Sequence, residues 1–411
     1  SVLGSLNATG RADARFRMAG IGAYGGRRTW RAEVEPRSGV EVQPEAFRVR
    51  INELRGRVLL EGELSLGAEP ADAPRAGARG RVVPLVGHWV AGGTVAAQAD
   101  IPAMGDGAIE LHAAALDLAH PALGGALSEA RTSGVGGFAG PGLASLNVTG
   151  RIDFHGDFVL PEAAPRALES LYRVYLREND VRTAAELGRL DLASLVGTLE
   201  QSGSGDLIGT ELRARLAGTP LFLRDARFGS RADRFRFETS LEALELPIDR
   251  EHLAPFLDEP MVASLLDDLG WRGELDIRGA RLELETGADG VGEAVLRGSI
   301  EPRAMSIDLG LPIEVETALV TIDEFAFGPS GARLQASVSN LHGKVSDREI
   351  ERASMRLAYA EGRLEVIGLA ARLENGRVDS LSADSGERPF FAIELAEPYR
   401  FELAGALSDV E

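Results

Sequence analysis

Six histidines have the greatest capacity for metal binding or proton transfer in this sequence, which contains no cysteine. None of them forms an HExxH motif or a close pair along the chain. A metal site would therefore need folding to bring distant histidines together, and we expect scattered surface or satisfied side chains instead. The six are His88, His112, His120, His155, His252 and His342.

Motifs for phosphate binding and nucleophilic catalysis are also missing. Residues 134–140 are rich in glycine but lack the GxGxxG spacing, and there is no Walker loop. Gly203-Ser204-Gly205 is too tight for a GxSxG elbow. Acidic pairs such as Asp267-Asp268 are adjacent in sequence, so their side chains do not face one another on a helix. We therefore predict that the chain is not an enzyme and needs no cofactor or metal.

The charge balance excludes one class of partner. The net charge is −19, from 44 basic and 63 acidic residues. A surface this acidic repels phosphate backbones and anionic head groups at long range. We expect no nucleic-acid partner, and no flat adhesion to an anionic membrane.

Alternation of apolar and charged residues at period two is the dominant pattern and predicts strands with one buried face. Arg234–Glu238 and Glu274–Arg278 are clear cases. The phase slips by one after Gly279, which indicates a β-bulge. Charged residues, among them Asp276, mark the outward parity and predict an apolar inner face. That face comprises Phe47, Val49, Ile51, Phe235, Phe237, Leu275, Ile277, Leu282, Leu284, Phe325 and Phe327.

Two segments are predicted to be helices that cap or plug an adjoining sheet. Residues 161–196 contain apolar residues at spacings of three and four, such as Leu168, Leu171 and Tyr175. Residues 249–270 begin at a plausible N-cap, Asp249, and end at a plausible C-terminal glycine, Gly270.

Three other stretches are predicted to be connections. Residues 68–80 are rich in Ala, Pro and Gly, and residues 133–142 are rich in Gly, so both are expected to be loops. Residues 82–99 carry no formal charge, but their Gly and Pro content favours two strands with a turn near Gly92-Gly93 over a membrane span.

An internal repeat divides the chain. Residues 3–13 recur as residues 143–153, and a fainter copy spans residues 269–276. Each copy is expected to begin a series of strands, near Gly10, Gly150 and Gly273, because repeated units stack to bury their apolar faces. We expect three segments: residues 1–142, residues 143–248 with the first helix, and residues 249–411 with the second helix.

Residues 296–384 resemble the AsmA/TamB-like superfamily, whose members alternate amphipathic strands with Gly- and Pro-containing turns. The resemblance is carried by Leu311-Pro312-Ile313, by Phe327-Gly328-Pro329, and by the run from Ala358 to Val378 that contains Gly368-Leu369. The family often has a Tyr-Gly-Gly-like turn where this chain has Glu374-Asn375-Gly376, which keeps the left-handed turn chemistry.

The resemblance implies a mainly β fold: an elongated, curled, U-shaped repetitive antiparallel sheet with two minor helical segments. It also implies a periplasmic protein tethered to the inner membrane through a segment not present in this chain. The expected function is phospholipid transport between inner and outer membranes along an apolar groove. The expected partners are acyl lipid, the two membranes and an outer-membrane β-barrel protein.

Two other functions are compatible with the same strands. A non-enzymatic scaffold for outer-membrane β-barrel assembly would share the sequence signature of a conduit, and an open or a sealed inner face would distinguish them. An adhesive or glycan-active β-solenoid would need exposed aromatic ladders or carboxylate pairs, and only 6% of the residues are aromatic.

Overall fold

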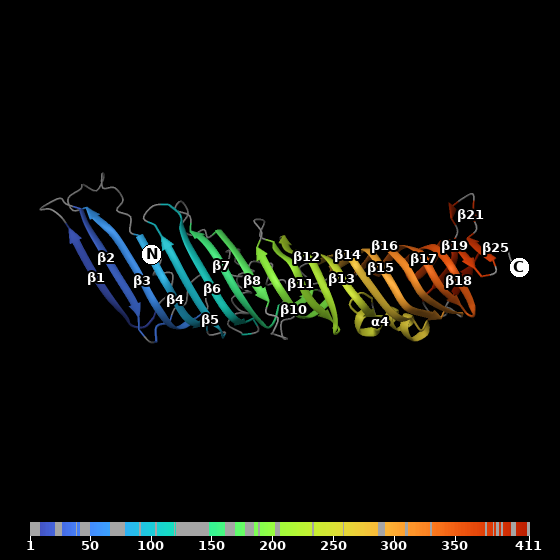
Figure 1. The fold of residues 1–411 in the computed structure, drawn as a ribbon, viewed down its shortest axis with the longest axis horizontal. Coiled ribbons are helices and arrows are strands. Elements are labelled where there is room, and N and C mark those ends of the chain that lie inside the picture. Colours follow the sequence, from blue (N-terminus) through green and yellow to red (C-terminus); the bar gives the residue numbers. More distant parts are fainter. Residues whose placement is uncertain are drawn as a thin grey trace. The chain divides into compact units, whose positions relative to one another are not determined.

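The structure is a computed structural model of the 411-residue chain (Figure 1). It describes residues 9–20, 27–37, 39–41, 50–65, 79–89, 92–102, 105–118, 120, 148–160, 169–176, 185–187, 190–201, 206–231, 234–257, 259–286, 292–308, 311–328, 331–374, 376–380, 382–383, 386–387, 389–395 and 400–408. Both predicted loops lie outside the described residues, apart from the two residues that begin a strand at Arg79.

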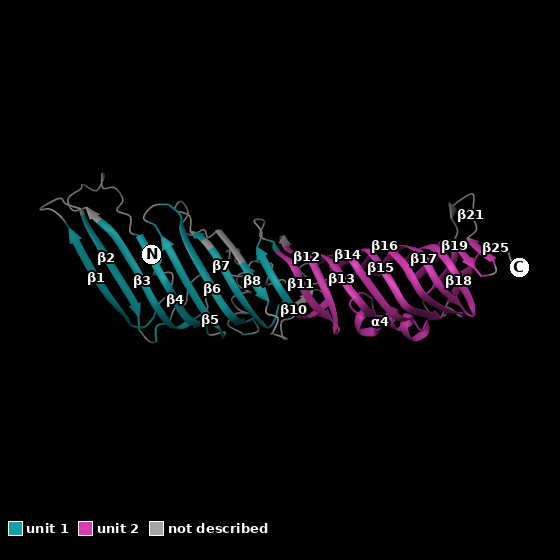
Figure 2. Cartoon of the chain, in the orientation of Figure 1, with its two compact units in different colours: residues 1–183, 196–207 teal, residues 184–195, 208–411 magenta. Residues whose placement is uncertain are grey.

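The predicted fold class is confirmed: the chain is mainly β, with antiparallel strands that do not close into a barrel and with short helices. It divides into two compact units, residues 1–183 with 196–207 and residues 184–195 with 208–411 (Figure 2).

Unit 1 is a meander in which each strand pairs antiparallel with the next one along the chain, from β1 to β8. Its strands are β1 (Ala12–Gly20), β2 (Arg27–Pro36), β3 (Ile51–Ser65), β4 (Arg79–Trp89), β5 (Thr94–Ile101), β6 (Gly107–Asp117), β7 (Arg151–Leu160) and β8 (Glu169–Leu176). Gly92 and Gly93, both at positive φ, connect β4 to β5, which confirms the predicted turn.

Unit 2 continues the same pattern with longer strands. From β12 to β19 each strand pairs antiparallel with the next. Its main strands are β11 (Leu207–Leu216), β12 (Thr219–Arg231), β13 (Arg234–Pro247), β14 (Arg272–Thr286), β15 (Gly292–Asp308), β16 (Pro312–Gly328), β17 (Gly331–Val345), β18 (Arg348–Ala360) and β19 (Arg363–Leu373).

β10 and seven short strands complete the described chain. They are β9 (Ala185–Leu187), β10 (Leu190–Gln201), β20 (Gly376–Ser380), β21 (Ser382–Ala383), β22 (Gly386–Glu387), β23 (Pro389–Glu394), β24 (Arg400–Leu403) and β25 (Gly405–Ser408). The β10 strand is shared between the units, with residues 190–195 in unit 2 and residues 196–201 in unit 1. In unit 2, β19 pairs with both β20 and β23, and β23 pairs with β24.

One predicted helix is confirmed and the other is wrong. Residues 249–270 contain α3 (Arg250–Leu253), α4 (Glu259–Ala263) and a π-helical turn (Ser264–Asp268). The side chain of Asp249 caps α3, and Gly270 adopts a φ of +59° after the last turn, both as predicted. The described parts of residues 161–196 are instead the strands β8, β9 and β10.

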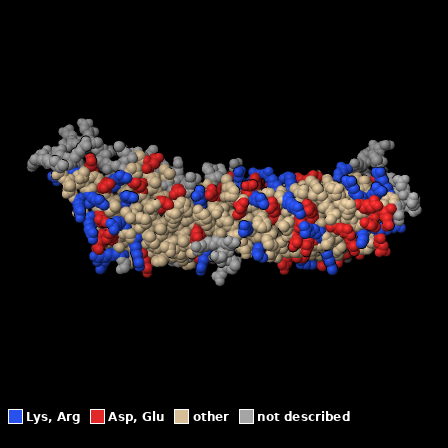
Figure 3. Space-filling model, viewed as in Figure 1, with Lys and Arg blue, Asp and Glu red and all other residues tan. Residues whose placement is uncertain are grey.

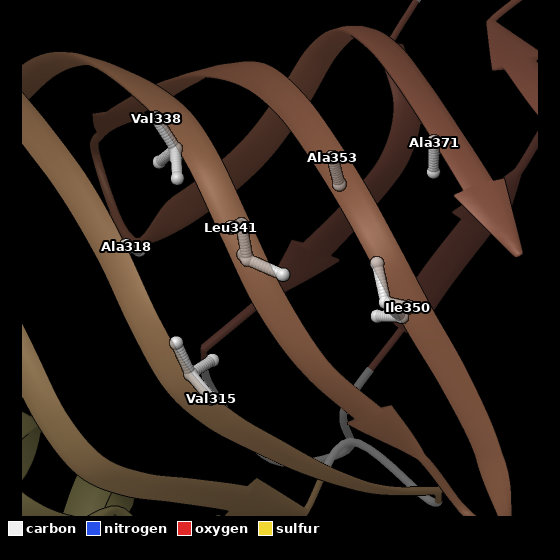
Figure 4. Close-up of a cluster of buried hydrophobic side chains, with 7 residues drawn as sticks. All are labelled: Val315, Ala318, Val338, Leu341, Ile350, Ala353 and Ala371. Atoms are coloured by element: carbon white, nitrogen blue, oxygen red, sulfur yellow. The ribbon is translucent and has the colours of Figure 1, made fainter.

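Most long strands contain a bulge at a residue with positive φ. Gly279, where the sequence predicts a phase slip, has a φ of +66°, and the register between β14 and β15 shifts beside it. The same combination occurs at Ala115, Asp225, Glu245 and Asn340. A bulge bends its strand, so the positions other than Ala115 account for bends in strands of unit 2. Figure 4 shows curved strands of this unit around the buried cluster.

The three predicted repeat starts are alike in backbone conformation. Gly10, Gly150 and Gly273 adopt φ values of +127°, +104° and +132°, and each lies at or just before the start of a strand. A Cβ atom at Gly273 would lie 2.7 Å from the Cα of Met305, and one at Gly10 would lie 2.8 Å from the Cα of Val40. Positive φ thus favours glycine at all three positions, and close backbone approach also requires it at Gly10 and Gly273.

Candidate functional site

The predicted inner-face residues of unit 2 come together through strand register. Phe237 lies opposite Leu284, Leu284 opposite Ala294, and Ala294 opposite Phe327. Directly opposite residues share one face of a sheet, so these side chains form a single row. Phe237, Leu284 and Phe327 are all buried.

A second row, the long apolar ladder, crosses eight strands of unit 2. Every pair of neighbours in it is directly opposite in register. Two of its members, Leu282 and Phe325, are predicted inner-face residues. The ladder consists of Leu282, Leu296, Phe325, Leu334, Tyr359, Leu364, Ile393 and Phe401.

A third row, the short apolar ladder, begins at the predicted residue Ile277. It continues through Ile300, Val320, Val338 and Met355, one from each strand from β15 to β18. Val338 belongs to a buried cluster on β16 to β19 that also contains Val315, Ala318, Leu341, Ile350, Ala353 and Ala371 (Figure 4).

Burial along this face is uneven. Phe237 is 1% exposed and Leu282 is 3% exposed, so the face is sealed over β13 and β14. The side chains packed around the cluster, including Met355 and Leu357, are only partly buried. The long ladder ends at Phe401, which is 70% exposed. All the residues of the cluster and its partly buried neighbours belong to β15–β20, so within the described chain no helix contributes to it.

The helical segment lies against the buried row of this face, at Phe327 on β16. Phe256, between α3 and α4, meets Phe327 edge to face, with ring centroids 5.2 Å apart. This aromatic contact agrees with the prediction that residues 249–270 cap or plug an adjoining sheet. No helix among the described residues has the length and apolarity to cross a membrane.

The other predicted residues are placed as follows. Leu275 is half-buried in β14, and Ile51 is half-buried at the start of β3, in unit 1. Phe235 lies in β13, but its side chain is outside the described part of the structure. Phe47 and Val49 lie outside the described residues.

Asp276 lies opposite Glu301 and beside exposed Arg278, on the face opposite Ile277, but its side chain is fully buried instead of exposed to water. The bulge at Glu245 turns its backbone N–H toward β14, where it donates to Asp276 Oδ1 at 2.9 Å. Arg303 Nε lies 2.8 Å from the other carboxylate oxygen. The hydrogen bond from Glu245 and the ion pair with Arg303 thus offset part of the cost of burying this carboxylate, although Oδ2 accepts no hydrogen bond among the described residues.

A small polar chain joins α3 to the hairpin between β11 and β12. His252 Nδ1 lies 2.7 Å from Asp249 Oδ1, and its Nε2 lies 2.9 Å from the Thr219 hydroxyl oxygen. Burial acts to raise the pKa of Asp249, but hydrogen bonds from the ring and backbone N–H of His252 outweigh it and lower that pKa. The His252 side chain is 5% exposed, so this arrangement serves to hold the helix on the hairpin.

Folding assembles a histidine pair that the sequence separates by 43 positions. His112 on β6 is directly opposite His155 on β7, and their Nδ1 atoms are 3.0 Å apart. The next opposite pair on the same face is Glu110 and Asp157. Glu110 Oε1 lies 2.6 Å from His112 Nε2, and Asp157 Oδ2 lies 3.2 Å from His155 Nε2.

Hydrogen bonds first from His112 and then from Gln98 lower the pKa of Glu110. One ligand atom from each of Glu110, His112 and His155 lies within 4.8 Å of the other two. The prediction that the histidines are scattered is therefore wrong for this pair. His112 lies five residues before the end of β6 and His155 four residues after the start of β7, and the bulge at Ala115 takes up the difference, so register and not sequence spacing brings them together.

A shallow pocket of about 280 Å³ lies at the ends of β16 to β19, beside Leu334 and Tyr359 of the long ladder. Its charged lining residues are already paired, Arg333 with Glu293 and Arg363 with Glu365. Comparison with protein-family models, curated proteins and solved structures finds no match to this chain.

Proposed function

We propose that the chain is a segment of a periplasmic lipid-transfer protein, in which the apolar face of unit 2 holds phospholipid acyl chains. The long apolar ladder carries this proposal, because it crosses eight strands without a charged residue and ends at exposed Phe401. The sequence resemblance to AsmA/TamB-like proteins supports a role in lipid transport between inner and outer membranes.

The energetics favour such a face. Exposing an acyl chain to water costs about 0.8 kcal/mol per CH₂ group. Partly buried apolar side chains such as Met355 and Leu357 leave accessible apolar surface along the strands. A continuous apolar path over β15–β20 lowers that cost at each step, while a charged head group can stay in water.

A structural scaffold for outer-membrane protein assembly is the second candidate. The nearly complete burial of Phe237 and Leu282 favours it, because a dry core stabilises a spacer without binding lipid. On this view the apolar face is only a core. No enzymatic step, cofactor or nucleic acid is part of either proposal.

Native mass spectrometry of the purified chain tests the proposal, using Met355→Asp and its neighbour Ser354→Asp. Met355 is partly buried on the apolar face, whereas Ser354 is exposed on the opposite face of the same strand. We expect phospholipid to co-purify with the parent chain and with Ser354→Asp. Met355→Asp is expected to lose most of it, because the new carboxylate must be desolvated by an acyl chain.

Thermal melting separates the two candidates. A conduit predicts that Met355→Asp loses lipid while its melting temperature stays close to that of Ser354→Asp. If Met355→Asp instead unfolds and the parent chain carries no lipid, the face is a sealed core and the scaffold function stands.

A further inference from the structure

The outer face of β6 and β7 in unit 1 carries an arrangement that the lipid proposal does not use. His112 and His155 lie side by side on this face, and Glu110 and Asp157 lie side by side next to them. Ala113 and Phe154, which alternate with the histidines, are buried on the other face. The four polar side chains are therefore accessible from solvent and are held by strand register.

The hydrogen bonds determine which ring nitrogens carry protons. An ionised carboxylate only accepts hydrogen bonds, so His112 Nε2–H donates to Glu110 and His155 Nε2–H donates to Asp157. In a neutral imidazole the other nitrogen is then a bare acceptor. Two acceptor Nδ1 atoms thus face one another at 3.0 Å, an unfavourable contact that either a proton on one of them or a metal ion beside them would relieve.

We propose that His112 and His155 bind a divalent transition-metal ion, with Zn²⁺ the best match, and that Glu110 and Asp157 position the two rings through Nε2. An ion at about 2.0–2.1 Å from both Nδ1 atoms would lie beside the line that joins them. A tetrahedral site would need the two nitrogens to separate to about 3.3 Å, a shift that exposed side chains can make.

The ligand chemistry selects the class of metal. Imidazole nitrogens favour zinc and other late transition metals, whereas Ca²⁺ and Mg²⁺ require mainly oxygen ligands. The contact of Asp157 with His155 Nε2 is the carboxylate–histidine arrangement that orients a metal-bound ring. Water would complete the coordination, since His112 is half exposed.

Binding would join two strands that are connected by a long stretch of chain. β6 ends at Asp117 and β7 begins at Arg151. An ion held from both strands adds a cross-strand link at this place, and the melting temperature of the chain should rise with added Zn²⁺.

Isothermal titration of the metal-free, untagged full chain with ZnCl₂ tests the proposal. We expect one ion per chain, with affinity reduced at least tenfold in His112→Ala and in His155→Ala. Asp157→Asn should bind one ion about tenfold more weakly, as expected for a positioning residue. His88→Ala is the matched control, because His88 is an exposed histidine on β4 opposite Thr94, and its affinity should be unchanged.

Three results would overturn the site: no Zn²⁺ binding by the parent chain, equal binding by the His112→Ala, His155→Ala double variant, or equal binding of MgCl₂. Far-UV circular dichroism of each variant shows whether the fold is retained. The lipid content of these variants should match that of the parent chain, so failure of one proposal leaves the other intact.

Discussion

Asp276 shows how one carboxylate can stabilise a bend in a strand. It accepts the backbone N–H of Glu245, a residue held at a φ of +55° within the bulge of β13. Unit 1 repeats the arrangement, because Asp153 accepts the backbone N–H of Ala115, whose φ is +56°. Both aspartates follow a repeat glycine by three positions, so the repeat carries a bulge-capping carboxylate as well as a turn.

Replacing this carboxylate is expected to be costly. Asp276→Ala removes a charged hydrogen-bond acceptor and should destabilise the chain by about 2–3 kcal/mol. Asp276→Asn keeps an acceptor for Glu245 and should cost about half as much. Urea unfolding of both variants measures this, with Glu301→Gln as control. Glu301 is directly opposite Asp276 and forms only an exposed ion pair with Arg278, so its change should stay within about 0.5 kcal/mol.

Asp249 predicts a pH dependence. Its pKa is lowered in the folded chain from the ordinary value of 3.8, because the hydrogen bonds from His252 outweigh the effect of burial. A lowered folded pKa gives stability that is present above pH 3.8 and is lost as the pH falls through the folded value. Asp249→Asn should therefore be less stable than the parent chain at pH 7, and the difference should shrink below pH 3.8.

Urea midpoints at a series of pH values measure the effect of Asp249→Asn. Glu316→Gln, which changes an exposed carboxylate on β16, should leave the difference from the parent chain constant. A pH-independent difference for Asp249→Asn would show that the ionised carboxylate does not contribute.

At the scale of the strand, glycine has two separate uses. Gly279 has a φ of +66°, yet a Cβ there would meet only Ser240 Oγ at 3.9 Å. Gly298 has a φ of +138°, and a Cβ there would lie 2.7 Å from the Cα of Ala280. The first glycine is needed for backbone conformation alone, and the second also for close approach of the neighbouring strand.

Alanine substitution should separate these uses. Gly279→Ala should destabilise the chain by about 1–2 kcal/mol, the cost of a left-handed conformation. Gly298→Ala should cost about 3 kcal/mol or more, because a backbone clash adds to the conformational cost. Chemical unfolding of both variants measures the order, and equal losses would show that the clash is relieved by a strand shift.

Strand alternation was predictable where charge marks one parity, and unpredictable where a bulge changes it. Gly279 made the phase slip in β14 predictable, because glycine favours positive φ. Glu245 and Asn340 also adopt positive φ, but residues of these types do not indicate a bulge in the sequence. Residues 169–176 have apolar spacings that also fit a helix, yet Arg173 and Tyr175 are exposed while Val174 and Leu176 are buried. Pairing with β7 and β10 decides between the two periods, and pairing is not visible in the segment itself.

The same limit applies to the candidate sites. Ile277, Leu282 and Leu284 were predictable from alternation within one strand. The ladders that join them to Tyr359 or Phe401 depend on register, which bulges shift several times across unit 2. The histidine pair depends on register as well, since only the pairing of β6 with β7 sets His112 opposite His155.

At the scale of the whole molecule, charge is spread in both signs. Figure 3 shows Lys and Arg interspersed with Asp and Glu over the viewed face, without a large patch of either sign. Many of these residues form exposed cross-strand pairs, such as Arg57 with Glu33 and Arg297 with Glu324. Each pair contributes little to stability, so the pairs chiefly keep the outer face soluble.

The two compact units should differ in stability. The strands β14 to β17 of unit 2 are 15 to 17 residues long, whereas β5 to β8 of unit 1 are 8 to 11 residues long. Trp30 and Trp89 lie in unit 1 and Trp271 lies in unit 2, so fluorescence can report each unit. We expect unit 1 to unfold at a lower urea concentration than unit 2. Trp271→Phe keeps only the tryptophans of unit 1, and the Trp30→Phe, Trp89→Phe double variant keeps only that of unit 2. The first variant should therefore show the lower urea midpoint, and coincident midpoints would contradict this.

The pairing of each strand with the next along the chain has a consequence for how the protein folds. Strands that pair in the meander leave the ribosome one after the other, so a hairpin can form before the rest of the sheet has been synthesised. Where the connections are short, as between β16 and β17 or β17 and β18, closing the loop is entropically cheap, which favours rapid folding there. A hairpin formed at any point in the chain can pair with the next strand on either side, so folding can begin at many places and spread strand by strand. Until growth is complete, the last strand added exposes an unpaired edge, so the nascent sheet is most open to mispairing at its growing end.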